Sequence, residues 1–112
     1  MDDVLKSMRA VSDELRVRIL LLLTDREACV CELMAVFGLA QSRLSHHLRT
    51  LHAAGFLKDE KRGRWNYYRV HPASLDGVNR SLVQSLRGWF ASSALVERDR
   101  TALKRAKQRL HC

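Results

Sequence analysis

Apolar residues recur at intervals of three and four over much of the chain, a spacing that predicts amphipathic helices. Two such stripes open the chain. One covers residues 3–11, and the other ends at about Leu23 and can be capped by Ser12 or Asp13. A third helix ends at Gly38, where a left-handed backbone conformation costs least. The chain is therefore expected to begin with a succession of short helices.

The helix after Gly38 separates apolar from polar side chains. At ~100° per residue, Leu48 and Leu51 lie within about 40° of Leu44, so these leucines form one buried stripe. The opposite face carries hydroxyl, imidazole and guanidinium groups, which reach base edges in a DNA major groove. Two helices joined by a short turn with a glycine form a helix-turn-helix, here over about residues 29–54. A solvated amphipathic helix of an unrelated bundle is the alternative.

We predict that this second helix of the pair contacts DNA through its polar face. His47 is the exception, because it lies about 60° from Leu44 and is expected to pack at the edge of the core. The predicted DNA contacts are Gln41, Ser42, Arg43, Ser45, His46 and Arg49.

The pattern becomes extended after Gly55. Two β-strands flank Gly63, which predicts a hairpin over about residues 56–70 with Tyr68 and Val70 toward the core. Its tip is basic and is suited to phosphates or an adjacent minor groove. Hairpin tips are also commonly charged for solubility, so the hairpin alone does not decide between these readings. The predicted DNA contacts of this wing are Lys61, Arg62 and Arg64.

Two apolar stripes follow Pro72, over about residues 74–110. The first comprises Leu75, Val78, Leu82, Leu86 and Trp89, and the second Leu95, Ala102, Leu103, Ala106 and Leu110. One small domain has little left to cover them, so we expect these terminal helices to pair across a two-fold axis in a homodimer.

The 112 residues carry a formal net charge of +8, which favours a polyanionic partner, first a nucleic acid and second an anionic membrane. The length indicates a single domain over 1–112. No stretch approaches the ~20 apolar residues of a spanning helix, and the start of the chain does not resemble a secretion signal. We therefore expect a cytoplasmic protein with no membrane partner. No catalytic constellation is visible, so an enzyme is not expected.

The three cysteines should be reduced thiols in that compartment, which favours metal binding or reactivity over a structural disulfide. On a regular helix Cys29 and Cys31 would lie ~200° apart. Two thiolates sharing one ion, with bonds of about 2.3 Å as for zinc, need sulfurs within roughly 4 Å. The pair must then lie at a frayed or irregular helix start, or the ion must distort that start; a helix N-terminus is also expected to lower a thiol pKa. Buried small apolar residues with no ligand role are the alternative.

Together these stretches resemble the ArsR/SmtB family of metal-responsive repressors. SDELRVRILLLL resembles the family's second helix, and QSRLSHHLRTLHAAGFLKDEKRGRWNYYRV resembles its recognition helix and wing. ACVCEL resembles the Cys-Val-Cys-Asp/Glu box of the arsenic-sensing branch. The resemblance implies a winged helix-turn-helix, mainly α with a β-hairpin. It also implies a dimeric repressor that leaves its double-stranded operator when an ion binds.

The resemblance makes As(III) or Sb(III) the expected effector, bound by Cys29 and Cys31. Met34 stands where some family members have a third cysteine, so a three-sulfur site needs Cys112, from the same tail or from the dimer partner. The ion would strain the first turn of the helix on which the recognition helix packs. Other readings are a redox switch, a response to another thiophilic metal (Cd, Zn or Cu), and a DNA-binding protein without an effector.

Overall fold

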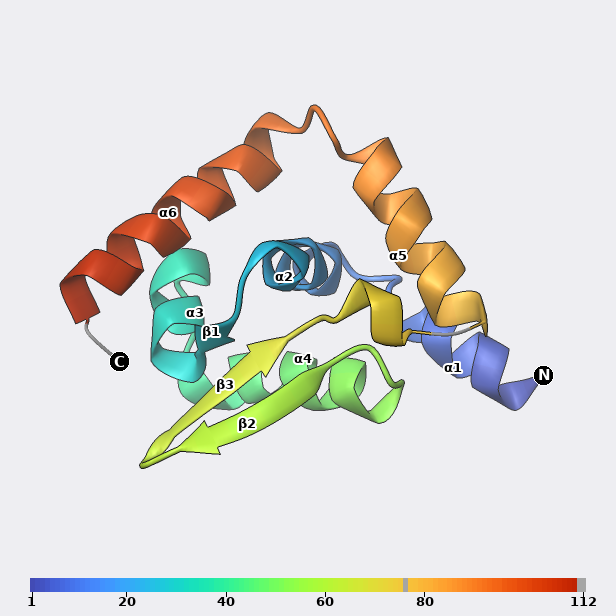
Figure 1. Ribbon diagram of the computed structural model, residues 1–112, viewed down its shortest axis with the longest axis horizontal. Coiled ribbons are helices and arrows are strands. Elements are labelled where there is room, and N and C mark those ends of the chain that lie inside the picture. Colours follow the sequence, from blue (N-terminus) through green and yellow to red (C-terminus); the bar gives the residue numbers. More distant parts are fainter. Residues whose placement is uncertain (76, 111–112) are drawn as a thin grey trace.

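The computed structural model describes residues 1–75 and 77–110 and is mainly helical, with one small antiparallel sheet (Figure 1). The helices are α1 (Asp2–Ala10), α2 (Glu14–Asp25), α3 (Val30–Phe37), α4 (Gln41–Ala53), α5 (Gly77–Trp89) and α6 (Ala94–Leu110), with a 3₁₀ turn, η1, at Pro72–Ser74. The strands are β1 (Ala28–Cys29), β2 (Lys58–Arg62) and β3 (Trp65–Arg69). The predicted class, mainly α with a β-hairpin, is confirmed. No helix in the described ranges is both long and apolar enough to cross a membrane.

The core forms around α2, over which α5 and α6 arch in Figure 1. All five residues from Ile19 to Leu23 are buried. The leucine stripe of α4 is also buried, at Leu44, Leu48 and Leu51. Burying one such side chain contributes ~1.5–3 kcal/mol, so packing against α2 holds the helix-turn-helix in place.

Local signals set the ends of the paired helices. Asp13 caps α2, where its carboxylate accepts a hydrogen bond from the Arg16 backbone N–H at 3.1 Å. Gly38 ends α3 with φ of 62°, a left-handed conformation that favours glycine. Ala40 precedes α4 and provides no side-chain cap, because its methyl group cannot accept a hydrogen bond. At the far end of α4, the Asn79 side-chain amide donates to the Ala54 carbonyl at 2.8 Å.

The apolar stripes of the terminal helices are covered in part within the chain itself. Leu86, Leu103 and Ala106 are buried, and α6 packs against α2 and α3. The expectation that a single domain could not cover these stripes is therefore wrong for these positions. Trp89 differs, since 73% of it is exposed.

Ion pairs join α6 to α2 and to α3. Among residues 1–75 and 77–110 they are Arg18–Asp99, Asp25–Arg100 and Glu32–Lys107. The Arg18 guanidinium donates to both Asp99 carboxylate oxygens, at 2.8 and 3.0 Å. These contacts join residues far apart in sequence, so no local pattern predicts them.

The wing is part of a three-stranded sheet in the order β1–β3–β2. The expected hairpin is present, with Val70 buried and Tyr68 half-buried. The third strand, β1, was not predicted. It places Ala28 opposite Tyr68 and Cys29 opposite Tyr67. The backbone of the cysteine pair is therefore tied directly to the wing.

Candidate thiol sensor and nucleic-acid interface

The cysteine pair lies where β1 becomes α3. Cys29 is the N-cap residue of α3, with an extended backbone at φ −89° and ψ 166°, and Cys31 lies in the first helical turn. Because Cys29 is not helical, the side chains avoid the opposed directions of a regular helix. Their Sγ atoms are 3.0 Å apart. The predicted irregular helix start is present, and the sulfur separation falls within the roughly 4 Å that one shared ion requires.

The two cysteines differ in their access to solvent. Cys29 is 0% exposed, whereas Cys31 is half-buried. Burial raises the pKa of the Cys29 thiol, and the nearby Glu32 carboxylate acts in the same direction. The expectation of a lowered pKa is wrong for Cys29, because loss of hydration outweighs the favourable helix N-terminus. An ion would reach the pair from the side of Cys31.

A buried carboxylate holds this helix start in position. Glu32, 3% exposed, accepts a hydrogen bond from the Cys29 backbone N–H at 3.0 Å. The same oxygen accepts from Nζ of Lys107 at 2.9 Å. The end of α6 is thereby joined to the first turn of α3. Sequence reasoning missed both residues, although a glutamate three positions after an N-cap is a recognisable capping signal.

No group of three or more metal-ligating His, Cys, Asp or Glu side chains occurs within residues 1–75 and 77–110. The third predicted ligand, Cys112, lies outside the described residues. Within the described part of the chain, the soft donors brought together are the sulfurs of Cys29 and Cys31.

The polar face of α4 is open along its length. Gln41, Ser42, Arg43, His46 and Arg49 are exposed, and Ser45 is half-buried. Neither arginine of this face forms an ion pair with the residues that the structure describes. The structure thus brings all the predicted α4 contacts onto one accessible helix, with two guanidinium groups available to an anion.

His47 faces the interior, as expected. It is 7% exposed, and its Nδ1 lies 3.3 Å from Nη1 of Arg16, which can donate to it. Burial lowers the pKa of His47. A neutral imidazole here accepts from the Arg16 guanidinium, so this contact joins α4 to α2.

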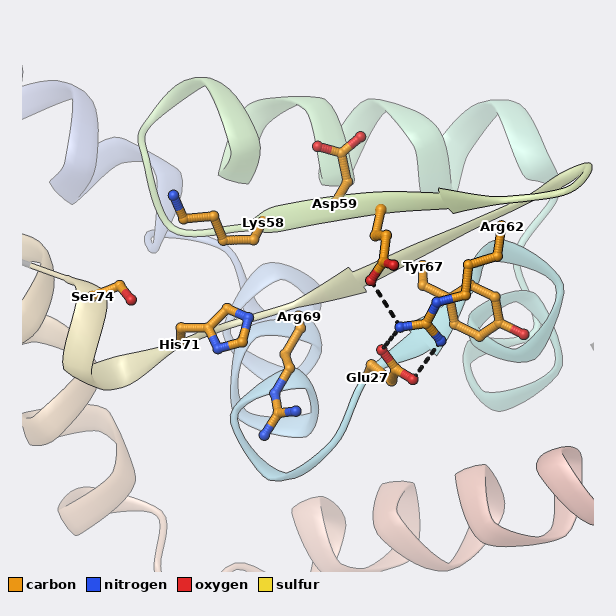
Figure 2. Close-up of a pocket in the computed structure, with 9 residues that line it drawn as sticks. Glu27, Lys58, Asp59, Arg62, Tyr67, Arg69, His71 and Ser74 are labelled. Atoms are coloured by element: carbon orange, nitrogen blue, oxygen red, sulfur yellow. Dashed lines mark hydrogen bonds and ion pairs between the residues drawn. The ribbon is translucent and has the colours of Figure 1, made fainter.

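The three predicted DNA contacts of the wing differ in their surroundings. Lys61 and Arg64 are exposed and take part in no ion pair within the described ranges. Arg62 instead lies in a surface cleft of about 540 Å³, where its guanidinium meets the Glu27 carboxylate (Figure 2). Asp59 points away from that cleft in Figure 2, and its carboxylate lies 3.0 Å from Nε2 of His52 on α4.

Comparison with known proteins places these features in context. The profile of a family described as "Bacterial regulatory protein, arsR family" matches residues 13–59. The chain is 40% identical over 97 residues to the arsenic resistance transcriptional regulator ArsR2 of Pseudomonas putida, a match that covers 83% of this chain and 82% of that protein. It is 36% identical over 91 residues to ArsR1 of the same organism, covering 78% and 71%. Reduced HlyU from Vibrio cholerae superposes with a TM-score of 0.69 at 25% identity, over 81% of this chain and 92% of that one.

Proposed function

The chain belongs to the ArsR family of bacterial regulatory proteins, and on this premise we propose that it is a repressor released from operator DNA by As(III) or Sb(III). A member of this family is a DNA-binding transcriptional regulator and not an enzyme. The observation that carries the proposal is the 3.0 Å separation of the Cys29 and Cys31 sulfurs beside the helix-turn-helix. Two of the relatives described above are named as arsenic resistance regulators, and they support the choice of effector.

Arsenite, unlike a divalent cation, can react with a thiol that still carries its proton. A dication binds thiolates, so each thiol must first lose its proton to solvent, which the raised pKa of Cys29 opposes. Arsenous acid carries its own hydroxyl groups. Each As–S bond that forms breaks one As–OH bond, and the hydroxyl leaves as water with the thiol proton. A neutral thiol in the reduced protein is therefore a suitable partner.

The fold offers a route from the sulfurs to the DNA. α3 begins at the cysteine pair and packs against α4. An ion bridging both sulfurs constrains the first turn of α3, and this changes how α4 is presented to the major groove. A coupling of ~1–3 kcal/mol is typical of allostery and gives roughly fivefold to 150-fold weaker DNA binding.

We propose Cys112 as a third sulfur ligand, supplied by the same chain. Support comes from the contact between Lys107 and Glu32, which brings the end of α6 to the first turn of α3. Five residue-to-residue steps lead from Lys107 to Cys112, and they can span at most about 17 Å. The partner's Cys112 is the alternative within a dimer.

The proposed repressor acts as a homodimer through its C-terminal helices, joined by α1. α1 leaves Val4, Leu5 and Met8 more than 40% exposed, and Trp89 on α5 is 73% exposed. These side chains are suited to an isologous contact. Half-sites one helical turn apart, or a multiple of it, would then receive the two α4 helices.

Fluorescence anisotropy tests the proposal, with a labelled duplex that the protein itself selects from a random-sequence library. Reduced wild-type complex is titrated with arsenite, beside Cys31→Ser, Cys112→Ser and a control, Ser81→Ala, at an exposed position of α5. Arsenite should release the wild type and the control, and Cys31→Ser should stay bound. Release that is unchanged in Cys31→Ser would overturn the proposal.

Further arms of the titration separate the alternatives. Loss of arsenite affinity in Cys112→Ser supports a three-sulfur site, whereas unchanged affinity leaves a site of two sulfurs. Release by peroxide but not by arsenite would identify a redox switch. Release by Cd(II), Zn(II) or Cu(I) alone would identify another thiophilic metal. A complex that none of these dissociates, with a steep salt dependence and little sequence preference, would be an effector-free DNA binder.

A further inference from the structure

The cysteine segment has a second connection to the DNA-binding surface, through the sheet. Cys29 lies in β1 and faces Tyr67 across an antiparallel pair. β3 in turn pairs with β2 as far as the tip, where Arg62 faces Trp65. A movement of the Cys29 backbone is therefore transmitted to β3 without passing through α3 or α4.

Side chains reinforce this connection on the cleft face of the wing. Arg62 donates to both carboxylate oxygens of Glu27, at 2.7 Å each, and to Glu60 at 2.9 Å. Its guanidinium carbon lies 4.5 Å from the centre of the Tyr67 ring. Figure 2 shows the Arg62 guanidinium held between the Tyr67 ring and the Glu27 carboxylate. Glu27 immediately precedes β1, so the wing tip is bound to the chain that leads into the cysteine pair.

The charged groups around Arg62 distinguish it from Lys61 and Arg64, its basic neighbours in the wing. Arg62 meets two carboxylates, Glu27 and Glu60, so the charge of its guanidinium is compensated within the protein. The hydrogen bonds from Arg62 hold the pKa of the Glu27 carboxyl below its usual range, which keeps the pair ionised. Exposed ion pairs contribute little to stability. Bidentate, stacked geometry instead fixes orientation.

We propose that Arg62 is a positioning residue that couples the cysteine pair to the wing, rather than a DNA contact. With Glu27 and Tyr67 it joins the segment that carries Cys29 to the hairpin that carries Lys61 and Arg64. An ion at the cysteine pair then shifts the wing tip away from the phosphates, in addition to its effect on α4. This inference rests on the proposed function and adds the wing as a second moving part.

The test compares Arg62→Gln and Glu27→Gln with Arg64→Gln, a matched neutralisation two residues away. Two quantities are measured for each: operator affinity without arsenite, and the factor by which saturating arsenite weakens it. Arg62→Gln and Glu27→Gln should reduce that factor several-fold, and the double variant should reduce it no further than either single variant. Arg64→Gln should lose more operator affinity without arsenite than Arg62→Gln does. Arsenite should weaken its DNA binding by the same factor as in the wild type.

A readout on the wing itself complements the binding data. In a Trp89→Phe background, used once its oligomeric state and operator affinity are found to match those of the wild type, fluorescence reports Trp65, which is 39% exposed at the start of β3. Arsenite should change this signal in the parent and change it less in Arg62→Gln. Two results would overturn the coupling role and leave the proposed function standing. In the first, arsenite weakens DNA binding by Arg62→Gln as much as it weakens binding by the wild type. In the second, Arg62→Gln loses as much operator affinity without arsenite as Arg64→Gln does. Absence of release from the wild type would overturn both.

Discussion

Replacing Lys107 by methionine tests how α6 holds the start of α3. The variant keeps the apolar stem but removes the ammonium that meets Glu32 at 2.9 Å. The Glu32 side chain is 4% exposed, so its charge stays buried, while Lys107 is 18% exposed. Breaking a fully buried pair costs ~3–5 kcal/mol. Partial solvent access and the remaining bond from the Cys29 N–H reduce this to about 2 kcal/mol.

Urea unfolding in reductant at one fixed protein concentration measures this loss, because dimer formation would make stability depend on concentration. A loss of about 2 kcal/mol should also lower Tm by roughly 8 °C in a chain of this size. Lys104→Met, an exposed lysine without an ion pair in the described ranges, is the control and should change stability by less than about 0.5 kcal/mol.

A double-mutant cycle with Glu32→Gln completes this test. Glu32→Gln alone should cost less than Lys107→Met, since the amide oxygen still accepts from the Cys29 N–H and Lys107 can turn to solvent. The double variant should be more stable than the sum of the single losses implies. The reasoning is refuted if Lys107→Met matches the Lys104→Met control, or if the single losses simply add.

Three further predictions concern other parts of the fold. The pKa of His47 is lowered from 6.5, so the folded state binds fewer protons than the unfolded state below that pH. Stability should fall as pH drops from about 6.5 through the folded pKa, and His47→Asn should flatten this component in urea unfolding series. Gly38→Ala should lower the free energy of unfolding by about 1 kcal/mol. The loss comes from the φ of 62° alone, because the space for a methyl group at this position is open. Calorimetry would show a smaller loss of stability for Gly38→Asn. In DNA-binding assays, Arg49→Ala should lose about 1–3 kcal/mol and relax specificity, whereas Lys61→Ala should weaken all sequences alike and reduce the salt slope by about 1.

Local periodicity explains why much of the fold could be predicted from the sequence. The leucine stripe of α4, the glycine at the end of α3 and the alternation around Gly63 each report a local conformation, and the structure has all three. The family resemblance rested on these same stretches and is confirmed by the comparisons. The irregular helix start could also be predicted, because a pair at spacing two cannot share an ion on a regular helix.

Features that depend on distant contacts could not be predicted in this way. β1 has only two residues, too few to show a period, so its pairing with β3 is visible only in the structure. The side chain of Arg62 turns toward Glu27 because of strand register, which the basic run at the tip conceals. Burial of Cys29 reverses the pKa shift expected from its helix position.

Thermodynamic reciprocity gives the most direct measurement of the central claim, that an ion at the cysteine pair and DNA at α4 influence each other. Calorimetric titration with arsenite should be performed on the free protein and on the protein saturated with its selected duplex. The account predicts weaker arsenite binding to the complex, by the same factor by which arsenite weakens DNA binding. Equal arsenite affinities for the free and the DNA-bound protein would contradict it.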